Sequence, residues 1–209
     1  EAGEETALIE SLEGKRAQPR LKPPFPAVAG LYQSPTAVNN VETLCNVPAI
    51  IRNGAERFAS LGPEKNGGPK LYCISGHVNN PGVYEASMHT TLRELIYDPK
   101  FGGGIRGGHK MKCVIPGGSS VPVLLPDQLD VPASFDGVAS AGSLLGSAGL
   151  IVMDETTCMV WAAQNLMYFY RHESCGKCTP CREGGDWLYK LLVKIERCDG
   201  EMRDLDLLL

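Results

Sequence analysis

The sequence has little that would suit it to binding nucleic acid or entering a membrane. Its 20 Lys and Arg are outnumbered by 24 Asp and Glu, and the basic residues are dispersed rather than gathered into a stripe. We therefore set aside a nucleic-acid partner. No apolar run approaches the ~20 residues needed to cross a bilayer. The N-terminal stretch EAGEETALIESLEGKRAQPR is acidic and mixed where a signal peptide would be basic and then apolar, so we expect a soluble cytoplasmic protein without direct membrane insertion.

The sequence also lacks a second C-x-x-C pair, although it has eight cysteines. Four of them are solitary, namely Cys45, Cys73, Cys113 and Cys158. In apolar contexts such as KLYCISG and KMKCVIPGG a free cysteine is expected to be a small buried hydrophobe. Three others, Cys175, Cys178 and Cys181, fall within seven positions of ESCGKCTPCREGG. Such bunching favours a metal site over disulfides.

The spacing C-x-x-C-x-x-C favours an iron–sulfur cluster, because steps of three residues bring successive sulfurs round to nearly the same side. Structural zinc usually takes two separated C-x-x-C pairs, or cysteine with histidine at set offsets, so zinc is the alternative. A histidine near such a motif, here His172, is more commonly a surface or helix-capping residue than a metal ligand. A redox dithiol would need only two cysteines and a thioredoxin-like βαβ context, which is absent.

The fourth ligand of such a cluster is not evident from the segment itself. Cys181 is followed by Arg-Glu-Gly-Gly, whereas the bacterial ferredoxin pattern continues to a further Cys-Pro. Cys198 is the one later cysteine, and it falls on or just past the end of a helix, so we expect the ligand to lie beyond Leu209 instead. A helix after Cys181 is expected to direct its N-terminal amides at the sulfurs.

The pattern of the chain predicts an α+β protein in three stretches. Residues 1–65 contain a helix around Leu8 and Leu12, an extended arm at RLKPPFPAVAG, and a helix at VETLCNVPAIIRNGAERFASLG interrupted by Pro48. Residues 66–148 have the order of a β-grasp domain: strands at KLYCISGHV and GVYEA, a helix at TTLRELIYD with a capping box to Glu94, and strands at KMKCVIPGG and VPVLL. Residues 149–209 are helical, with the cysteines between two helices.

The segment ESCGKCTPCREG resembles the cluster-binding signature of the flavin- and NADH-binding subunit of bacterial respiratory NADH:quinone oxidoreductase. That family includes the diaphorase subunits of NAD-reducing hydrogenases and formate dehydrogenases. GEETALIESLEGKRAQPRLKPPFPA resembles the end of its Rossmann-like flavin domain, and PTAVNNVETL resembles the following segment. SGHVNNPGVYE through TTLRELI resembles its soluble-ligand-binding β-grasp domain. Because counterparts of the family's glycine-rich flavin loop and last cluster cysteine are absent, the chain is expected to be the C-terminal portion of a longer subunit.

The resemblance implies three cofactors, FMN, NAD(H) and a [4Fe-4S] cluster, and a set of site residues. It implies that Gly3, Glu4 and Glu5 lie beside the flavin and the dinucleotide, and that Lys22 and Phe25 border the NADH pocket. It further implies that Val38, Asn39 and Asn40 contact FMN, and that Cys175, Cys178 and Cys181 bind the cluster. Taken from the residues alone, Glu4 and Glu5 are first-turn helix carboxylates, Asn39 and Asn40 a turn or cap, and Phe25 a core residue.

The implied function is oxidation of NADH through FMN, with single electrons passed to the cluster and on toward quinone. The implied partners are other subunits of the complex, notably a small iron–sulfur subunit, on the cytoplasmic face of the inner membrane. The alternatives are a diaphorase subunit of a hydrogenase or formate dehydrogenase, a non-catalytic docking module, and a zinc-stabilised module. The chain alone is expected to be inactive.

Overall fold

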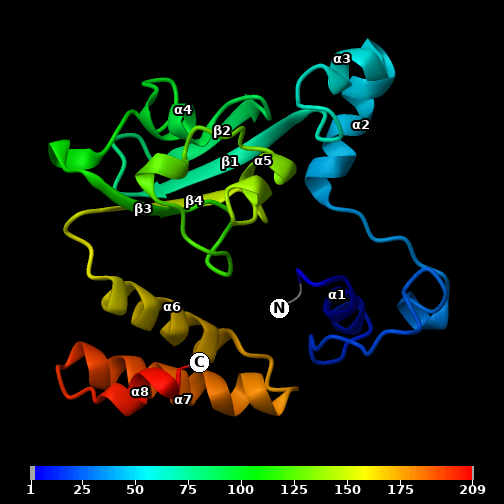
Figure 1. Cartoon of the computed structure of the whole chain (residues 1–209). Helices are drawn as coiled ribbons and strands as arrows, with labels where there is room; N and C mark the ends of the chain where they lie inside the picture. Colours follow the sequence, from blue (N-terminus) through cyan, green and yellow to red (C-terminus); the bar gives the residue numbers. More distant parts are fainter. Residues whose placement is uncertain (1–2, 209) are drawn as a thin grey trace. The chain divides into compact units, whose positions relative to one another are not determined.

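The computed structural model describes residues 3–208, which form two compact units (Figure 1). One unit combines the first 44 residues with the segment that follows Thr157, and the other contains residues 45–157. The boundary between them falls within α2 (Val41–Asn53). Within the described residues, no helix is both long enough and apolar enough to span a bilayer.

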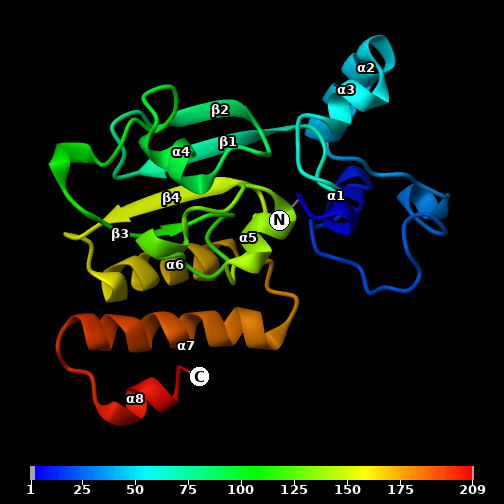
Figure 2. The ribbon, with the colours of Figure 1, turned by 45° about the horizontal axis from the view of Figure 1, so that its top comes forward.

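The unit of residues 45–157 is built on a mixed four-stranded sheet in the order β2-β1-β4-β3 (Figure 2). Its strands are β1 (Pro69–Gly76), β2 (Gly82–Ser87), β3 (Met111–Ile115) and β4 (Gly149–Asp154). β1 pairs antiparallel with β2 and parallel with β4, and β3 runs antiparallel to β4. The shorter elements of this unit are α3 (Ala55–Ala59), α4 (Leu92–Tyr97), η2 (Arg106–Gly108), η3 (Pro126–Gln128) and α5 (Phe135–Ser140).

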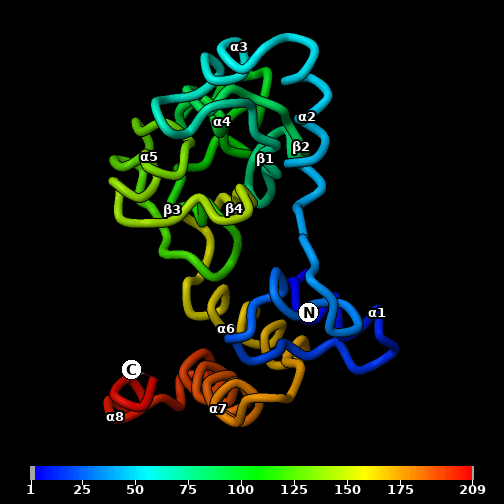
Figure 3. Tube along the Cα trace, turned by 90° about the vertical axis from the view of Figure 1, so that its right-hand side faces the viewer, coloured from blue at the N-terminus to red at the C-terminus, as the bar shows by residue number. Residues whose placement is uncertain are grey.

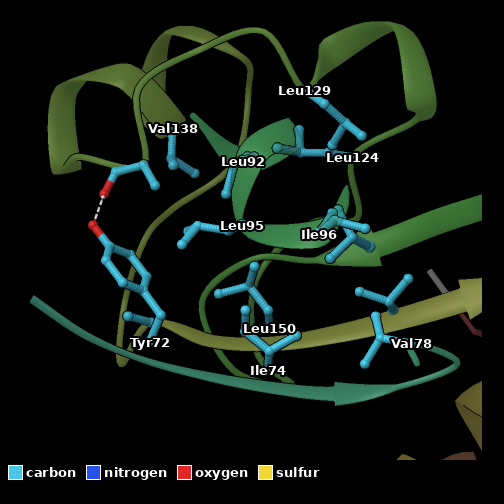
Figure 4. Close-up of a cluster of buried hydrophobic side chains, with 14 of the residues drawn as sticks. Tyr72, Ile74, Val78, Leu92, Leu95, Ile96, Leu124, Leu129, Val138 and Leu150 are labelled. Atoms are coloured by element: carbon cyan, nitrogen blue, oxygen red, sulfur yellow. Dashed lines mark hydrogen bonds between the residues drawn. The ribbon is translucent and has the colours of Figure 1, made fainter. Parts of the chain in front are cut away.

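A single hydrophobic core lies between one face of this sheet and the helices α4 and α5 (Figure 4). Leu92, Leu95 and Ile96 of α4 are fully buried against Ile74 of β1 and Leu150 of β4. The hydroxyl of Tyr72, also fully buried, donates a hydrogen bond of 2.5 Å to the carbonyl oxygen of Ala133. That bond satisfies the one polar atom of the largest core side chain.

The predicted hairpin and capped helix of this unit are confirmed. β1 and β2 pair from Pro69 opposite Ser87 to Ile74 opposite Gly82. Thr91 is the N-cap of α4: its hydroxyl accepts from the Glu94 amide at 3.1 Å, and the Glu94 carboxylate accepts from the Thr91 amide at 2.7 Å. Both features are local in sequence, which is why the residues alone predict them.

The prediction of a strand at VPVLL is wrong. The fourth strand of the sheet is instead one that the sequence pattern did not predict. Leu124 makes only an isolated bridge to Val114, whereas residues 149–154, expected to begin the helical stretch, form β4. β4 lies between β1 and β3, so it is buried in the centre of the sheet. The approach of β1 to β4 requires glycine at position 76, because φ there is +85° and a Cβ would lie 2.2 Å from the carbonyl oxygen of Val152.

The interruption expected at Pro48 occurs instead at Gly54. α2 continues through Pro48 to Asn53, and Gly54, with φ 88°, separates it from α3. A φ in this region ends a helix, and glycine reaches it without steric cost.

The prediction of buried solitary cysteines holds for one of the two quoted contexts. Cys113 in β3 is 2% exposed, but Cys73 in β1 is exposed. Successive residues of a strand face opposite sides, and the neighbours Tyr72 and Ile74 point into the core, so Cys73 points away from it. Cys45 and Cys158 are exposed as well.

Asp154, at the end of β4, supports a prediction about pH. Its side chain is buried; one carboxylate oxygen accepts from the hydroxyl of Thr156 at 2.6 Å and from its amide at 3.0 Å, and lies 2.9 Å from Nδ1 of His77. The Thr156 hydroxyl is the largest influence, and together with the Thr156 amide and His77 it lowers the pKa of Asp154 from 3.8 to about 2, although burial acts to raise it.

A folded-state pKa below the unfolded value stabilises the protein at high pH, and this contribution is lost as the pH falls from about 4 toward 2. We expect Asp154→Asn to lower the free energy of unfolding at pH 7, and we expect its deficit relative to the wild type to shrink at pH 3. Urea unfolding followed by circular dichroism at both pH values measures the two deficits. A deficit that is the same at pH 7 and pH 3 would contradict this assignment.

The other unit contains α1 (Glu5–Leu12), η1 (Leu31–Gln33), α6 (Met159–Glu173), α7 (Thr179–Glu196) and α8 (Met202–Asp206). α6 and α7 pack against each other as a helical hairpin. Arg171 near the end of α6 links them: its guanidinium lies 4.7 Å from the ring centroid of Tyr189, and its Nη1 lies 3.2 Å from Asp186. The loop that closes this hairpin carries Cys175 and Cys178, and Cys181 follows in α7.

Candidate metal centre

The cysteine motif lies across the start of α7. Cys175 is in the loop, Cys178 is the N-cap of α7, and Cys181 is inside the first turn of that helix. The helix therefore begins at Thr179, before Cys181 rather than after it as expected. Pro180 explains the early start, because proline at the first positions of a helix has a suitable φ and lacks only an N–H that would be unpaired there.

All three thiols are free, and two of them line one pocket. Cys175 is half-buried, whereas Cys178 and Cys181 are exposed. Cys175 and Cys181 line a pocket of about 470 Å³. Within the part of the chain that the structure describes, no three His, Cys, Asp or Glu side chains are grouped closely enough to hold a metal ion. The donor chemistry thus fits a thiolate-bound centre, while the sulfur atoms do not converge on one point.

The loop between the cysteines has its own side-chain supports. Arg182 donates from Nη1 to the carbonyl oxygen of Gly176 at 2.7 Å and from Nη2 to the hydroxyl of Thr179 at 3.3 Å. The Ser174 hydroxyl accepts from the Gly176 amide at 3.3 Å and lies 3.4 Å from the sulfur of Cys181. These contacts hold the loop in a turn whose Gly176 has φ 75°. Sequence reasoning did not single out Arg182 or Ser174.

Cys198 is excluded as a ligand of a centre held by Cys178 and Cys181. A helix rises ~1.5 Å per residue, so the 18 residues of α7 place its ends roughly 27 Å apart. Cys198 follows the C-terminal end, and the cysteine motif occupies the N-terminal end.

Three of the residues implied for the flavin and the dinucleotide come together at the start of α1. Nζ of Lys22 lies 3.2 Å from a carboxylate oxygen of Glu4 and 2.6 Å from one of Glu5. The second oxygen of Glu4 caps the helix by accepting from the amides of Thr6 and Ala7, each at 2.9 Å. Burial acts to raise the pKa of Glu4, but hydrogen bonds from the Thr6 hydroxyl and the Ala7 amide, together with Lys22, outweigh it and lower the pKa. The two glutamates raise the pKa of Lys22, with Glu5 the larger influence.

The other implied residues lie at the surface. Phe25 is 57% exposed, so the interpretation of it as a core residue is wrong, and Val38 is 36% exposed. Gly3 and Asn39 are exposed. Asn40 precedes α2, and its side-chain oxygen accepts from the Glu42 amide at 2.8 Å, which confirms the interpretation of this residue as a cap.

Glu4 is implied for the flavin and also lies at the pocket of the thiols. The pocket lined by Cys175 and Cys181 is also lined by Glu4 and Pro19. The structure therefore brings a residue implied for the flavin to the same pocket as two of the three clustered thiols.

Comparisons with known proteins agree with this site and with the sheet unit. Residues 161–209 match the family model "NADH-ubiquinone oxidoreductase-F iron-sulfur binding region", and residues 70–152 match the model "SLBB domain". The chain thus combines an SLBB domain with a helical iron–sulfur binding region. It belongs to the family of the F subunits of NADH-quinone oxidoreductase, as the sequence motifs predict.

Relatives in that family are similar over almost the whole chain. Identity is 58% over 204 residues with the second F subunit of Rhizobium meliloti, 56% over 207 residues with the F subunit of Mycobacterium tuberculosis strain H37Rv, and 51% over 208 residues with the F subunit of Rickettsia felis. These alignments cover 98%, 99% and 99% of this chain but 48%, 46% and 49% of the relatives. The chain thus spans about half the length of the curated relatives it matches.

Two solved structures of an NAD⁺-reducing [NiFe]-hydrogenase are also similar. The air-oxidised form has a TM-score of 0.85 over 98% of this chain and 34% of its own, and the H₂-reduced form has 0.88 over 99% and 34%. Both are 38% identical in sequence.

Proposed function

We propose that the whole subunit oxidises NADH through FMN and passes single electrons to a [4Fe-4S] cluster held by Cys175, Cys178 and Cys181, whose sulfur atoms would come together on binding it. When bound, the flavin supplies conversion of a two-electron input into single electrons, and the cluster supplies one-electron acceptance. Under this proposal, residues 1–65 contain the end of a flavin domain. The β-grasp domain extends past the expected limit of residue 148, because β4 (Gly149–Asp154) belongs to its sheet, and the cluster-binding domain follows β4. The fourth cluster ligand comes from outside residues 1–209.

The observation that carries the proposal is the pocket shared by Glu4, Cys175 and Cys181. An electron donor beside Glu4 and an acceptor on Cys175 and Cys181 would border the same pocket. The start of α7 supports the acceptor side, because its first amides lack partners within the helix and can donate to sulfur.

The residues implied for the flavin and the dinucleotide have distinct tasks in the proposal. Lys22 is the cation that a dinucleotide phosphate or carboxamide oxygen would meet, and Glu4 and Glu5 keep it in place by ion pairs. The exposed ring of Phe25 offers an aromatic face to the NADH pocket. Gly3 borders the flavin, and Val38, Asn39 and Asn40 contact the FMN.

The proposed assembly contains further subunits, including a small iron–sulfur subunit, on the cytoplasmic face of the inner membrane. The hydrogenase structures favour a second candidate, a diaphorase subunit that couples NAD to hydrogen instead of quinone, because 38% identity extends over nearly the whole chain. Purifying the native complex and assaying NADH oxidation with quinone or with a hydrogen electrode separates the two candidates.

Metal analysis tests the proposal against a zinc-stabilised or purely docking module. We expect the full-length subunit, purified without oxygen, to contain about four iron and four acid-labile sulfide per chain and to be brown. We expect NADH to bleach both the flavin and the cluster absorbance. Stoichiometric zinc without sulfide would show that the protein is a zinc-stabilised module. Absence of both iron and zinc would show that it is a docking module without a metal.

A further inference from the structure

Two crossed hydrogen bonds join the cysteine loop to the N-terminal segment of the same unit. Nε2 of Gln18 donates to the carbonyl oxygen of Cys175 at 2.9 Å, and Nζ of Lys177 donates to the carbonyl oxygen of Pro19. Figure 3 shows this N-terminal segment, in blue, running beside the loop between α6 and α7. Each segment thus supplies one side-chain donor and one backbone acceptor, and we call this pair of bonds the Gln18–Lys177 clasp.

The N-terminal side of the clasp is itself anchored to α1. Arg20 forms ion pairs with Glu10 and, at 2.8 Å, with Glu13, and it donates from Nη1 to the carbonyl oxygen of Gly30 at 2.9 Å. Its backbone amide donates to the hydroxyl of Thr6 at 2.8 Å. The stretch between Gln18 and Lys22 therefore has little freedom to move relative to the helix that begins beside Glu4.

The loop side of the clasp is anchored to α7 through Arg182, which binds the carbonyl oxygen of Gly176. The clasp closes the remaining gap between these two anchored parts. Without it, Cys175 would keep its connection to α6 and α7, but its carbonyl would lose the partner contributed by the N-terminal segment.

We propose that Gln18 and Lys177 are positioning residues that fix the cluster-binding loop relative to the segment of Glu4 and Lys22. The inference rests on the proposed function. Gln18 acts on the backbone of a thiol ligand and Lys177 is in the loop between two of them, so neither touches the reacting atoms. Outer contacts of this kind orient metal ligands and tune the metal.

Lys177 also holds its positive charge at the pocket of the thiols, because its ammonium donates to the carbonyl oxygen of Pro19, and Pro19 lines the same pocket as Cys175 and Cys181. Reduction adds a negative charge to the cluster, and a nearby cation stabilises that charge. Removing the charge is therefore expected to lower the midpoint potential of the cluster, whereas arginine at this position keeps both the charge and the donor.

The test uses Gln18→Met, Lys177→Met and Lys177→Arg in the full-length subunit, with Gln128→Met as the matched control. Gln128 donates from Nε2 to the carbonyl oxygen of Ala141 at 3.1 Å, so it makes the same kind of bond in the other unit. In cluster-free protein we expect the amides of residues 174–178 to exchange hydrogen roughly fivefold faster in Gln18→Met than in the control. In cluster-loaded protein we expect iron loss to a chelator to be about tenfold faster.

The potential and the arginine variant separate positioning from general stability. Lys177→Met is expected to lower the midpoint potential followed by electron paramagnetic resonance, and Lys177→Arg is expected to restore it. Equal exchange and iron loss in Gln18→Met and Gln128→Met would overturn the inference, as would a Lys177→Arg variant that behaves like Lys177→Met. A wild-type subunit that contains no iron or sulfide would contradict the proposed function itself. In that case, faster hydrogen exchange of the loop in Gln18→Met would show that the clasp holds the loop in place but positions no cluster.

Discussion

Replacing Cys178 with alanine in the full-length subunit should stop electrons from leaving the flavin while NADH still reduces it. The methyl group of alanine cannot bind iron. Loss of even an outer contact to a metal ligand typically lowers metal affinity or activity by about 10–100-fold. Loss of a ligand itself should therefore lower the rate of acceptor reduction by more than about 100-fold. The rate of flavin reduction by NADH should stay within about twofold of the wild type, because only the later step needs the thiols. Stopped-flow absorbance of the flavin and electron paramagnetic resonance of the dithionite-reduced cluster measure the two steps separately.

The matched control for this experiment is Cys198→Ala. Cys198 is an exposed thiol at the opposite end of the same helix, so its removal should leave both steps unchanged. If Cys178→Ala slowed flavin reduction as much as it slowed electron exit, the separation of the two steps would be wrong. A cluster lost in Cys198→Ala would contradict the exclusion of this residue as a ligand.

Truncating Leu95 to alanine should destabilise the SLBB domain by about 2–5 kcal/mol. Leu95 is fully buried in α4, at the centre of the core between that helix and the sheet, and its removal leaves a cavity that close-packed neighbours can fill only in part. Hydrogen exchange of the β1 and β4 amides in the full chain measures the free energy of opening of this unit.

Leu71→Ala is the control for the core variant, because Leu71 is in β1 of the same sheet but is 43% exposed. Surface substitutions usually change stability by less than about 0.5 kcal/mol, so this control should be near that value. Similar losses in the two variants would show that α4 does not form the core of the unit.

Features that depend on neighbours in the sequence were predictable. The hairpin of β1 and β2, the Thr91–Glu94 capping box and the two helices around the cysteines follow from turn residues, caps and periodicity within a few positions. The motif Cys175, Cys178 and Cys181 belongs with them, since its chemistry is contained in seven residues.

Features that depend on distant partners were not predictable. β4 was missed because a short apolar run does not distinguish a central strand from a helix, and its partner β1 is more than 70 residues away. The exposure of Cys73 depends on which face of the sheet α4 covers, and the Gln18–Lys177 clasp joins residues separated by 157 and 158 positions.

The sequence by itself therefore determined the β1–β2 hairpin, the capped helix α4, the thiol chemistry and the family, because each of these depends on a short contiguous pattern of residues. The tertiary structure alone decided that Glu4 shares a pocket with Cys175 and Cys181, that Lys22 pairs with Glu4 and Glu5, and that Cys198 lies at the far end of α7. The physical reason is that such contacts are made when packing closes long loops, and no local pattern specifies which distant segments it brings together.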